Sequence, residues 1–155
     1  MRVGFTGSRH GFWPKQENSF IDLISTKLSP IIEFHHGDCR GCDTEAHVWV
    51  KVTHQARIII HPPNVDKVRS FLPGDEIRLP RSYLIRNQDI VNESDVLIAV
   101  PHEDNEVIRS GTWSTWRYAN RINKPSILIL PNGMIKCSGA MSCSLLFKPK
   151  TLVES

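Results

Sequence analysis

Short, almost wholly apolar runs recur along the chain and predict strands that are buried on both faces. Strands of this kind are typical of parallel sheets, because helices cover both sides of such a sheet and leave no face for polar side chains. The runs are four to six residues long and are separated by stretches with a different period. The predicted strands cover residues 3–6, 31–36, 57–61, 96–100 and 126–130.

Between these runs, apolar positions spaced three or four residues apart predict amphipathic helices. The first helix starts at Pro14, since proline is favoured at the first helical position, and Ser29 with Pro30 ends it. Asp43 or Thr44 caps the second helix. The predicted helices cover about residues 14–28, 43–54, 80–91 and 112–123.

Strands and helices alternate along the chain, which predicts an α/β fold. We expect a Rossmann-like, doubly wound, mostly parallel five-stranded sheet flanked by helices. Residues 64–79 are polar and irregular and add no helix. A length of 155 residues fits one domain, which we place at residues 1–133. Residues 134–155 form a tail that packs on this domain or on a partner subunit, with either a short edge strand or a subunit contact at 144–147.

The composition is that of an ordinary globular protein and narrows the classes of function. Hydrophobic residues make up 40% of the chain, but no apolar run approaches the ~18 residues of a membrane span. The net charge of +3 suits an anionic small ligand and is too weak to predict nucleic-acid binding. The first residues pass straight into a strand pattern, so we expect no signal peptide. Four cysteines do not predict a disulfide scaffold, and we expect a cytoplasmic protein.

Three of the predicted strands are followed by loops that combine glycine with polar or basic residues, at 7–9, 37–41 and 110–112. Ligands of doubly wound sheets bind beyond the carboxyl ends of the strands, so we expect these loops to converge on one site. The loop at 110–112 also opens a helix, whose first N–H groups have no intrahelical partner and whose dipole favours an anion. The three loops together predict a pocket for a negatively charged metabolite.

The candidate ligand-binding residues come from these loops and from the helices beside them. They are Gly7, Ser8, Arg9, Gly37, Asp38, Arg40, Gly41, Asp43, Arg86, Asn87, Arg109, Ser110, Gly111, Thr112 and Thr115.

Several of these residues have a purely structural alternative. Arg9 either clamps a phosphate through its planar guanidinium or is a solvated charge or an ion partner of Asp38. Asp38 and Asp43 are placed to accept hydrogen bonds from ribose hydroxyls, but Asp43 is equally a helix cap. Ser110 or Thr112 is alternatively only an N-cap, worth about 1 kcal/mol.

Four short motifs follow one another in a characteristic order. They are Gly7–Ser8–Arg9, then His36–Gly37–Asp38 with Arg40, Gly41 and Asp43, then Arg86–Asn87, and finally Arg109–Ser110–Gly111–Thr112 with Thr115. In this order and spacing the chain resembles the SLOG superfamily, named for the Smf DNA-processing proteins and the Lonely Guy phosphoribohydrolases. The resemblance covers residues 2–132 and points to the small single-domain members similar to the YspA group.

The resemblance implies a Rossmann-like fold with a pocket for a nucleotide or a nucleotide-derived molecule. Related domains sense NAD-derived or cyclic ADP-ribose-type signals in anti-phage defence, and others are enzymes that act on nucleoside monophosphates. The phosphoribohydrolases carry a Glu three residues after their Gly–Thr pair, where this chain has Thr115, which lacks a carboxyl group for acid–base catalysis. Glu45 lies nearby, but an acidic residue in the first turn of a helix usually serves the helix dipole. We therefore assign no catalytic residue.

Cys39 and Cys42 have the spacing of a metal-binding pair, and His35, His36 and His47 are close in sequence. A second Cys-x-x-Cys pair is lacking, and a structural zinc site normally needs four ligands. We interpret the two cysteines as small residues packed in a turn. We predict no metal site and no resident cofactor.

We predict a module that binds a phosphate-containing, nucleotide-derived small molecule, such as an ADP-ribose, NAD-derived or cyclic nucleotide signal, to sense or to sequester it. A phage protein that removes a defence signal would be one example. The alternative is a hydrolase that cleaves an N-glycosidic or phosphate bond of a nucleotide, with Glu45, Asp38, Asp43 and His61 as acid–base candidates. We expect no membrane or nucleic-acid partner, and we expect a homo-oligomer from the apolar third helix, the tail and Trp113.

Overall fold

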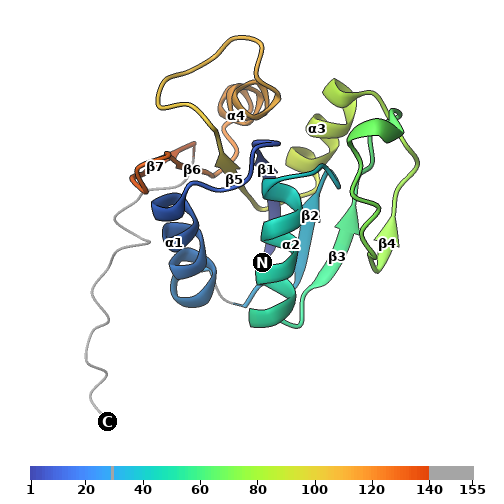
Figure 1. Ribbon diagram of the computed structural model, residues 1–155, viewed down its shortest axis with the longest axis horizontal. Coiled ribbons are helices and arrows are strands. Elements are labelled where there is room, and N and C mark those ends of the chain that lie inside the picture. The colour runs from blue at the N-terminus through green and yellow to red at the C-terminus, as the bar shows by residue number, and fades with distance from the viewer. Residues whose placement is uncertain (29, 140–155) are drawn as a thin grey trace.

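A seven-stranded sheet forms the centre of the computed structural model, which describes residues 1–28 and 30–139 (Figure 1). The strand order is β4–β3–β2–β1–β5–β6–β7, so that β4 and β7 lie at opposite edges. All neighbouring strands are parallel except β6 and β7. The strands are β1 (Arg2–Gly7), β2 (Glu33–His36), β3 (Arg57–Ile60), β4 (Glu76–Ile77), β5 (Val96–Val100), β6 (Ser126–Ile129) and β7 (Ile135–Ser138).

The order of the strands reverses between β1 and β5. From β1 the chain builds outward through β2, β3 and β4, and it then returns to the other side of β1 with β5 and β6. β1 and β5 pair in register as far as Gly7 and Val100, so both strands end at the same level. A crevice forms at such a reversal, because the loops that follow the two strands leave in opposite directions.

Helices cover both faces of the sheet. α1 and α2 contribute to the core on one face, and α3 packs against α4 on the other. α1 continues directly into a π-helical turn at Leu23–Lys27, which completes the first predicted helix. The helices are α1 (Pro14–Asp22), α2 (Cys42–Thr53), α3 (Tyr83–Asn92) and α4 (Gly111–Arg121), with a 3-10 turn at Asp66–Val68.

Successive side chains along each strand point to opposite faces of the sheet. Phe5 contacts Phe20 of α1 and Phe34 of β2, with ring centroids 5.5 and 5.8 Å apart. On the opposite face, Leu97 of β5 packs with Ile90 of α3. All five side chains are buried, so these strands are covered on both sides, and this double burial accounts for the continuous apolar runs in the sequence.

The prediction of five strands is wrong, because β4 and β7 extend the sheet at its two edges. β4 has two residues, which pair with Ile59 and Ile60 of β3, and this run is too short to show a periodic pattern. β7 follows a turn at residues 131–133, where Gly133 has a φ of 86°, and it returns antiparallel to β6. Its side chains are partly exposed, so no continuous apolar run marks it in the sequence.

Three helices begin at positions that differ from the prediction, and of these α4 starts one residue early, at Gly111. α2 starts one residue early, with Gly41 at the N-cap in place of Asp43 or Thr44. α3 starts three residues after Pro80, with Ser82 at its N-cap. Gly41 has a φ of 87°, which glycine adopts readily, so the start of α2 depends on a backbone conformation rather than on a capping side chain.

Some sequence predictions fall outside the described residues. They concern Ser29 at the end of the first helix and the strand or subunit contact at 144–147. Within residues 1–28 and 30–139, no helix combines the length and the hydropathy that crossing a membrane requires.

We predict that Gly4→Ala lowers the free energy of unfolding by about 1–3 kcal/mol, because the core cannot accept an added methyl group. A Cβ on Gly4 would overlap with Ser94 Oγ and would lie 3.1 Å from Ile90 O. Urea unfolding measures the loss. Gly111→Ala is the matched control, since the nearest atom to its Cβ is Asn87 Nδ2 at 4.0 Å. An equal loss of stability in both variants would contradict the packing argument.

Candidate functional site

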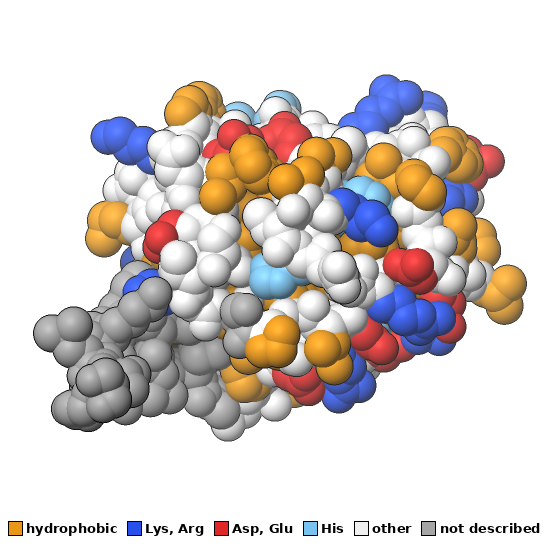
Figure 2. Space-filling view, turned by 90° about the horizontal axis from the view of Figure 1, so that it is seen from below, with side chains coloured by type: hydrophobic (Ala, Val, Ile, Leu, Met, Phe, Trp, Pro, Cys, Tyr) orange, Lys and Arg blue, Asp and Glu red, His pale blue; other side chains and the backbone are white. Residues whose placement is uncertain are grey.

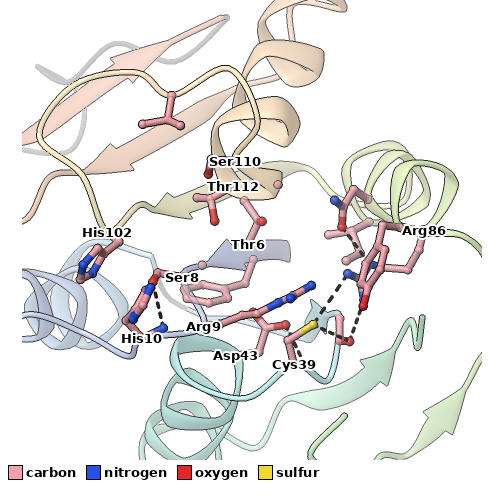
Figure 3. A pocket seen from close by; sticks show the side chains of 18 of the residues that line it. Thr6, Ser8, Arg9, His10, Cys39, Asp43, Arg86, His102, Ser110 and Thr112 are labelled. Carbon is pink, nitrogen blue, oxygen red and sulfur yellow. Dashed lines mark hydrogen bonds between the residues drawn. The ribbon is translucent and has the colours of Figure 1, made fainter. Parts of the chain in front are cut away.

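A cavity of about 550 Å³ opens where β1 and β5 end, at the reversal of the strand order (Figure 3). Its wall comes from the loops after β1 and β2, the first turn of α2, one side of α3 and the segment between β5 and α4. The structure thus brings residues from all three predicted loops to one cavity. The candidate residues that line it are Gly7, Ser8, Arg9, Gly37, Asp43, Arg86, Asn87, Arg109, Ser110, Gly111 and Thr112.

Backbone contacts hold the loops after β1 and β2 together. Cys42 N–H donates to Ser8 O at 2.9 Å, and Ser8 N–H donates to Val100 O of β5 at 3.0 Å. Gly41 approaches the backbone carbonyl of Arg9 so closely that any Cβ would overlap with it. Gly41 lies outside the cavity wall, and its role is to let one loop pack on the other.

The N-terminus of α4 presents backbone donors to the cavity. Ser110 is the N-cap, and its Oγ accepts a hydrogen bond from Trp113 N–H at 3.3 Å. Among the described residues, the N–H groups of Gly111 and Thr112 have no hydrogen-bond partner. Both residues line the cavity. Since the helix dipole gives this end a partial positive charge, it is suited to hold an anion.

The guanidinium of Arg9 extends into the cavity (Figure 3) and lies 5.3 Å from the centroid of the Tyr83 ring. Within the part of the chain that the structure describes, this side chain makes no hydrogen bond or ion pair. The alternative ion pair with Asp38 does not form, because Asp38 binds Arg69 at 3.0 Å. The donors of Arg9 are therefore available to a phosphate or a carboxylate.

Arg86, by contrast, uses its donors within the protein. Its Nη1 donates to Gly37 O at 2.7 Å and to His61 O at 3.1 Å, and its Nε donates to Asn87 Oδ1 at 2.8 Å. The side chain is buried. A Cβ on Gly37 would overlap with this guanidinium. Arg86 thus joins α3 to the loops after β2 and β3 and stabilises the cavity wall.

Asp43 is a buried carboxyl group in the cavity wall. Its Oδ2 accepts a hydrogen bond from Cys39 N–H at 3.1 Å. Burial raises the pKa of Asp43 to about 6, and the nearby Arg86 cation opposes part of this effect. Among the four acid–base candidates named from the sequence, Asp43 lines this cavity, whereas Glu45 accepts a hydrogen bond from Phe12 N–H at 3.2 Å outside it.

Three further candidates lie outside the cavity wall. Asp38 is fully buried, and its Oδ2 accepts a hydrogen bond from Arg69 Nε, so it holds a neighbouring segment rather than facing a ribose. Thr115 is buried, and its Oγ1 donates to Gly111 O at 2.7 Å within α4. Arg40 is exposed to solvent.

Sequence reasoning missed an aromatic stack beside the cavity. His10 and His102, which both line the cavity, stack with centroids 4.1 Å apart. Trp13 stacks on His102 at 5.1 Å, and its Nε1–H donates to His102 O at 3.0 Å. The two histidines are far apart in the chain, and the signal that could have found them is their position just after two predicted strands. The cavity is also lined by Phe5, Thr6, Cys39, Tyr83, Ile90, Glu103 and Val107.

Cys39 and Cys42 are buried free thiols in the turn before α2 and at its start. Burial raises the pKa of both thiols, so neither is activated as a thiolate. Cys39 Sγ lies 3.7 Å from Gly37 O and 3.8 Å from Arg86 Nη2. The surroundings of Cys39 are those of a packed side chain in a tight turn.

Comparisons with known proteins define the class of this protein by its fold. TM1055, a target of the Northeast Structural Genomics Consortium, matches with a TM-score of 0.62 at 17% sequence identity, over 86% of this chain and 76% of that one. The molybdenum cofactor binding protein from the phototrophic bacterium Rippkaea orientalis matches with a TM-score of 0.61 at 24% identity, over 81% of this chain and 74% of its own. No family model and no curated protein sequence matches. The chain has the Rossmann-like α/β fold, with a mostly parallel sheet flanked by helices.

Buried histidines link the stability of this fold to pH. His36 is fully buried, its Nε2 lies 2.9 Å from His47 Nδ1, and its Nδ1 accepts a hydrogen bond from Asp38 N–H. Burial lowers the pKa of His36 well below 6.5 and also lowers the pKa of His47. The folded protein therefore keeps these imidazoles neutral at pH values where the unfolded chain takes up protons.

We predict that stability is greatest above about pH 6.5 and falls as the pH drops, because only the unfolded state gains these protons. A histidine that stays neutral in the folded state lowers the free energy of unfolding by about 2 kcal/mol at pH 5. Asp43 acts in the opposite sense, since its raised pKa stabilises the fold below about pH 4 and this effect is lost as the pH rises through 6. Urea unfolding at several pH values measures the profile, which His47→Gln should flatten. Greater stability at pH 5 than at pH 7 would contradict this account.

Proposed function

We propose that this chain binds a phosphate-containing, nucleotide-derived small molecule in the cavity where β1 and β5 end. The observation that carries the proposal is that the N–H groups of Gly111 and Thr112 share a cavity with the guanidinium of Arg9, and that none of them has a hydrogen-bond partner among the described residues. A helix N-terminus and a guanidinium both favour an anion, and a guanidinium binds phosphate oxygens two at a time. A phosphate group between them is therefore the best-supported occupant.

The size and the wall of the cavity support a ligand larger than inorganic phosphate. A volume of about 550 Å³ lies within the roughly 300–1,000 Å³ of small-molecule sites. The stacked rings of His10 and His102 offer a flat surface to a base or another heteroaromatic ring. A molecule with a ring at one end and a phosphate at the other uses both features.

The class of ligand rests on the fold and on the loop motifs. One structural relative is a molybdenum cofactor binding protein, so this fold serves small-molecule binding in that protein. For this chain, the resemblance of its loops to the SLOG superfamily favours an ADP-ribose, NAD-derived or cyclic nucleotide signal. Sensing such a signal, or sequestering it during anti-phage defence, is the role that this resemblance supports by analogy. Assembly into a homo-oligomer belongs to the same hypothesis.

The charge distribution also favours a small ligand over a nucleic acid. On the face drawn in Figure 2, Lys and Arg side chains are interspersed with Asp, Glu and hydrophobic side chains. Nucleic-acid binding usually relies on a continuous basic surface that displaces counterions from the phosphate backbone. The net charge of +3 is consistent with this distinction.

A second candidate function is hydrolysis of the bound nucleotide derivative. Asp43 favours it, because a carboxyl group with a pKa of about 6 in the cavity wall is suited to general acid–base catalysis near neutral pH. Asp43→Asn would then abolish turnover while leaving binding intact. Mass spectrometry of the ligand after incubation separates the two functions, since binding returns it unchanged and hydrolysis returns products.

We predict that Arg9→Ala and Thr112→Trp each abolish ligand binding without unfolding the protein. The first change removes the unpaired cation, and the second places a large ring in front of the α4 N-terminus. Thermal denaturation with a panel of nucleotides, NAD, ADP-ribose and cyclic derivatives measures binding. A ligand at 100 times its Kd stabilises the folded protein by about 2.7 kcal/mol.

Arg40→Ala is the matched control for Arg9→Ala. Arg40 is an exposed arginine of the adjoining loop and lies outside the cavity wall, so its loss should leave affinity unchanged. If both Arg9→Ala and Thr112→Trp retain wild-type affinity, the ligand does not bind in this cavity. If Arg40→Ala weakens binding as much as Arg9→Ala, the effect reflects net charge rather than a specific contact.

A further inference from the structure

A second cavity, of about 560 Å³, lies beside α3 and shares Arg86 with the first. His61 and Glu93 line it, and His61 contacts the buried His35 of β2. A nitrogen of each imidazole and a carboxylate oxygen of Glu93 lie within 4.8 Å of one another. Two imidazoles and a carboxylate converge here from β2, from the end of β3 and from the end of α3.

The two imidazoles face each other, the second nitrogen of His35 is hydrogen-bonded to a carboxylate, and the Glu93 carboxylate lies beside His61 without a hydrogen bond to it. His35 Nδ1 and His61 Nε2 are 2.8 Å apart. His35 Nε2 lies 2.9 Å from Glu33 Oε1, and His61 Nδ1 lies 3.7 Å from Glu93 Oε2. A carboxylate in the position of Glu33 orients a metal-binding imidazole and directs the lone pair of its other nitrogen toward the ion.

The same carboxylates provide the charge that a divalent cation needs. Both imidazoles are almost completely buried, whereas the side chains of Glu33 and Glu93 are 30% and 36% exposed. Arg78 binds Glu93 Oε1 and so holds this carboxylate against the second cavity. The site combines imidazole nitrogen donors inside with carboxylates at its rim, and Arg78, Arg81 and Arg86 also line the second cavity.

We propose that His35, His61 and Glu93 bind a divalent transition metal ion such as zinc, at a site separate from the first cavity. Two imidazoles and one carboxylate are donors that zinc accepts, and a set of three leaves a coordination position open to water or a ligand. Zn–N bonds of about 2.0–2.1 Å place two nitrogens about 3.3 Å apart, so the histidine pair opens by about half an ångström. The ion takes the place of the hydrogen shared by the two imidazoles, which leaves as a proton to solvent. The second cavity is the entry path.

A second buried histidine pair in the same protein can be compared with this site. His36 and His47 also form a buried pair, with nitrogens 2.9 Å apart. There, His36 Nδ1 already accepts a hydrogen bond from the backbone N–H of Asp38, and neither histidine lines either of the two cavities. Among the described residues, no carboxylate joins this pair to form a group of three metal-ligating side chains, so the pair serves as a matched control.

Titration of the chelator-treated full chain tests the proposal, with Zn²⁺ followed by calorimetry and Co²⁺ by visible absorption. We expect one ion per chain and a Co²⁺ spectrum without sulfur-to-metal charge transfer. His61→Gln should weaken binding at least 100-fold, and Glu93→Gln should weaken it about 10- to 100-fold. His47→Gln, which removes an equally buried imidazole from the control pair, should keep wild-type affinity.

Circular dichroism establishes that each variant is folded before titration. If His61→Gln does not fold, Glu93→Gln carries the test, because its side chain lies at the cavity rim rather than in the core. The proposal is overturned if the wild type binds no Zn²⁺ at millimolar concentration, or if Glu93→Gln binds it as tightly as the wild type. A thiolate band in the Co²⁺ spectrum would also overturn it, since the ion would then be bound by a cysteine. Ligand binding in the first cavity is measured separately and does not depend on the outcome.

Discussion

The buried guanidinium of Arg86 is the interaction on which both cavities depend. A cation taken out of water is costly unless its donors are satisfied, and Arg86 meets this condition with the backbone carbonyls of Gly37 and His61 and the side chain of Asn87. These partners lie on three different segments, so satisfying one charge fixes α3 relative to the loops after β2 and β3. The positive charge also reaches Asp43, whose pKa it holds lower than burial alone would.

Two arginines of the first cavity have different roles, because Arg86 stabilises the cavity wall and Arg9 is placed to contact a ligand. Arg86 and Arg9 line the same cavity, but within residues 1–28 and 30–139 the donors of Arg86 have partners and those of Arg9 do not. Under the proposed function, the anion therefore binds to Arg9 and the N-terminus of α4 rather than to every arginine of the cavity wall. Arg86 also forms part of the wall of the second cavity, where the carbonyl of His61 is one of its partners. Arg86 is thus a structural residue that the two cavities have in common.

The sequence by itself determined the class of fold and the edge of the sheet at which the first cavity opens. Continuous apolar runs and helical spacing depend on neighbours along the chain, so they identified β1, β2, β3, β5 and β6 and all four helices. The loops that carry Gly7, Gly37 and Gly111 were predicted to meet, because parallel strands joined by right-handed crossovers bring their carboxyl ends to one edge. Edge strands carry no such pattern, because β4 is too short and β7 is only partly buried.

Only the tertiary structure decided which polar side chains face a cavity and which are already satisfied. Asp38 directly follows a strand, which is where a carboxylate that binds a ribose hydroxyl is expected. In the folded chain, however, its carboxylate binds Arg69, which lies 31 residues away in the sequence. His35 and His61 meet because β2 and β3 are neighbours and pair in register, and no local spacing in the sequence connects them to Glu93. The type of a residue determines which groups its side chain is able to bind. Strand register and the path of the crossovers determine which of those groups lies within contact distance.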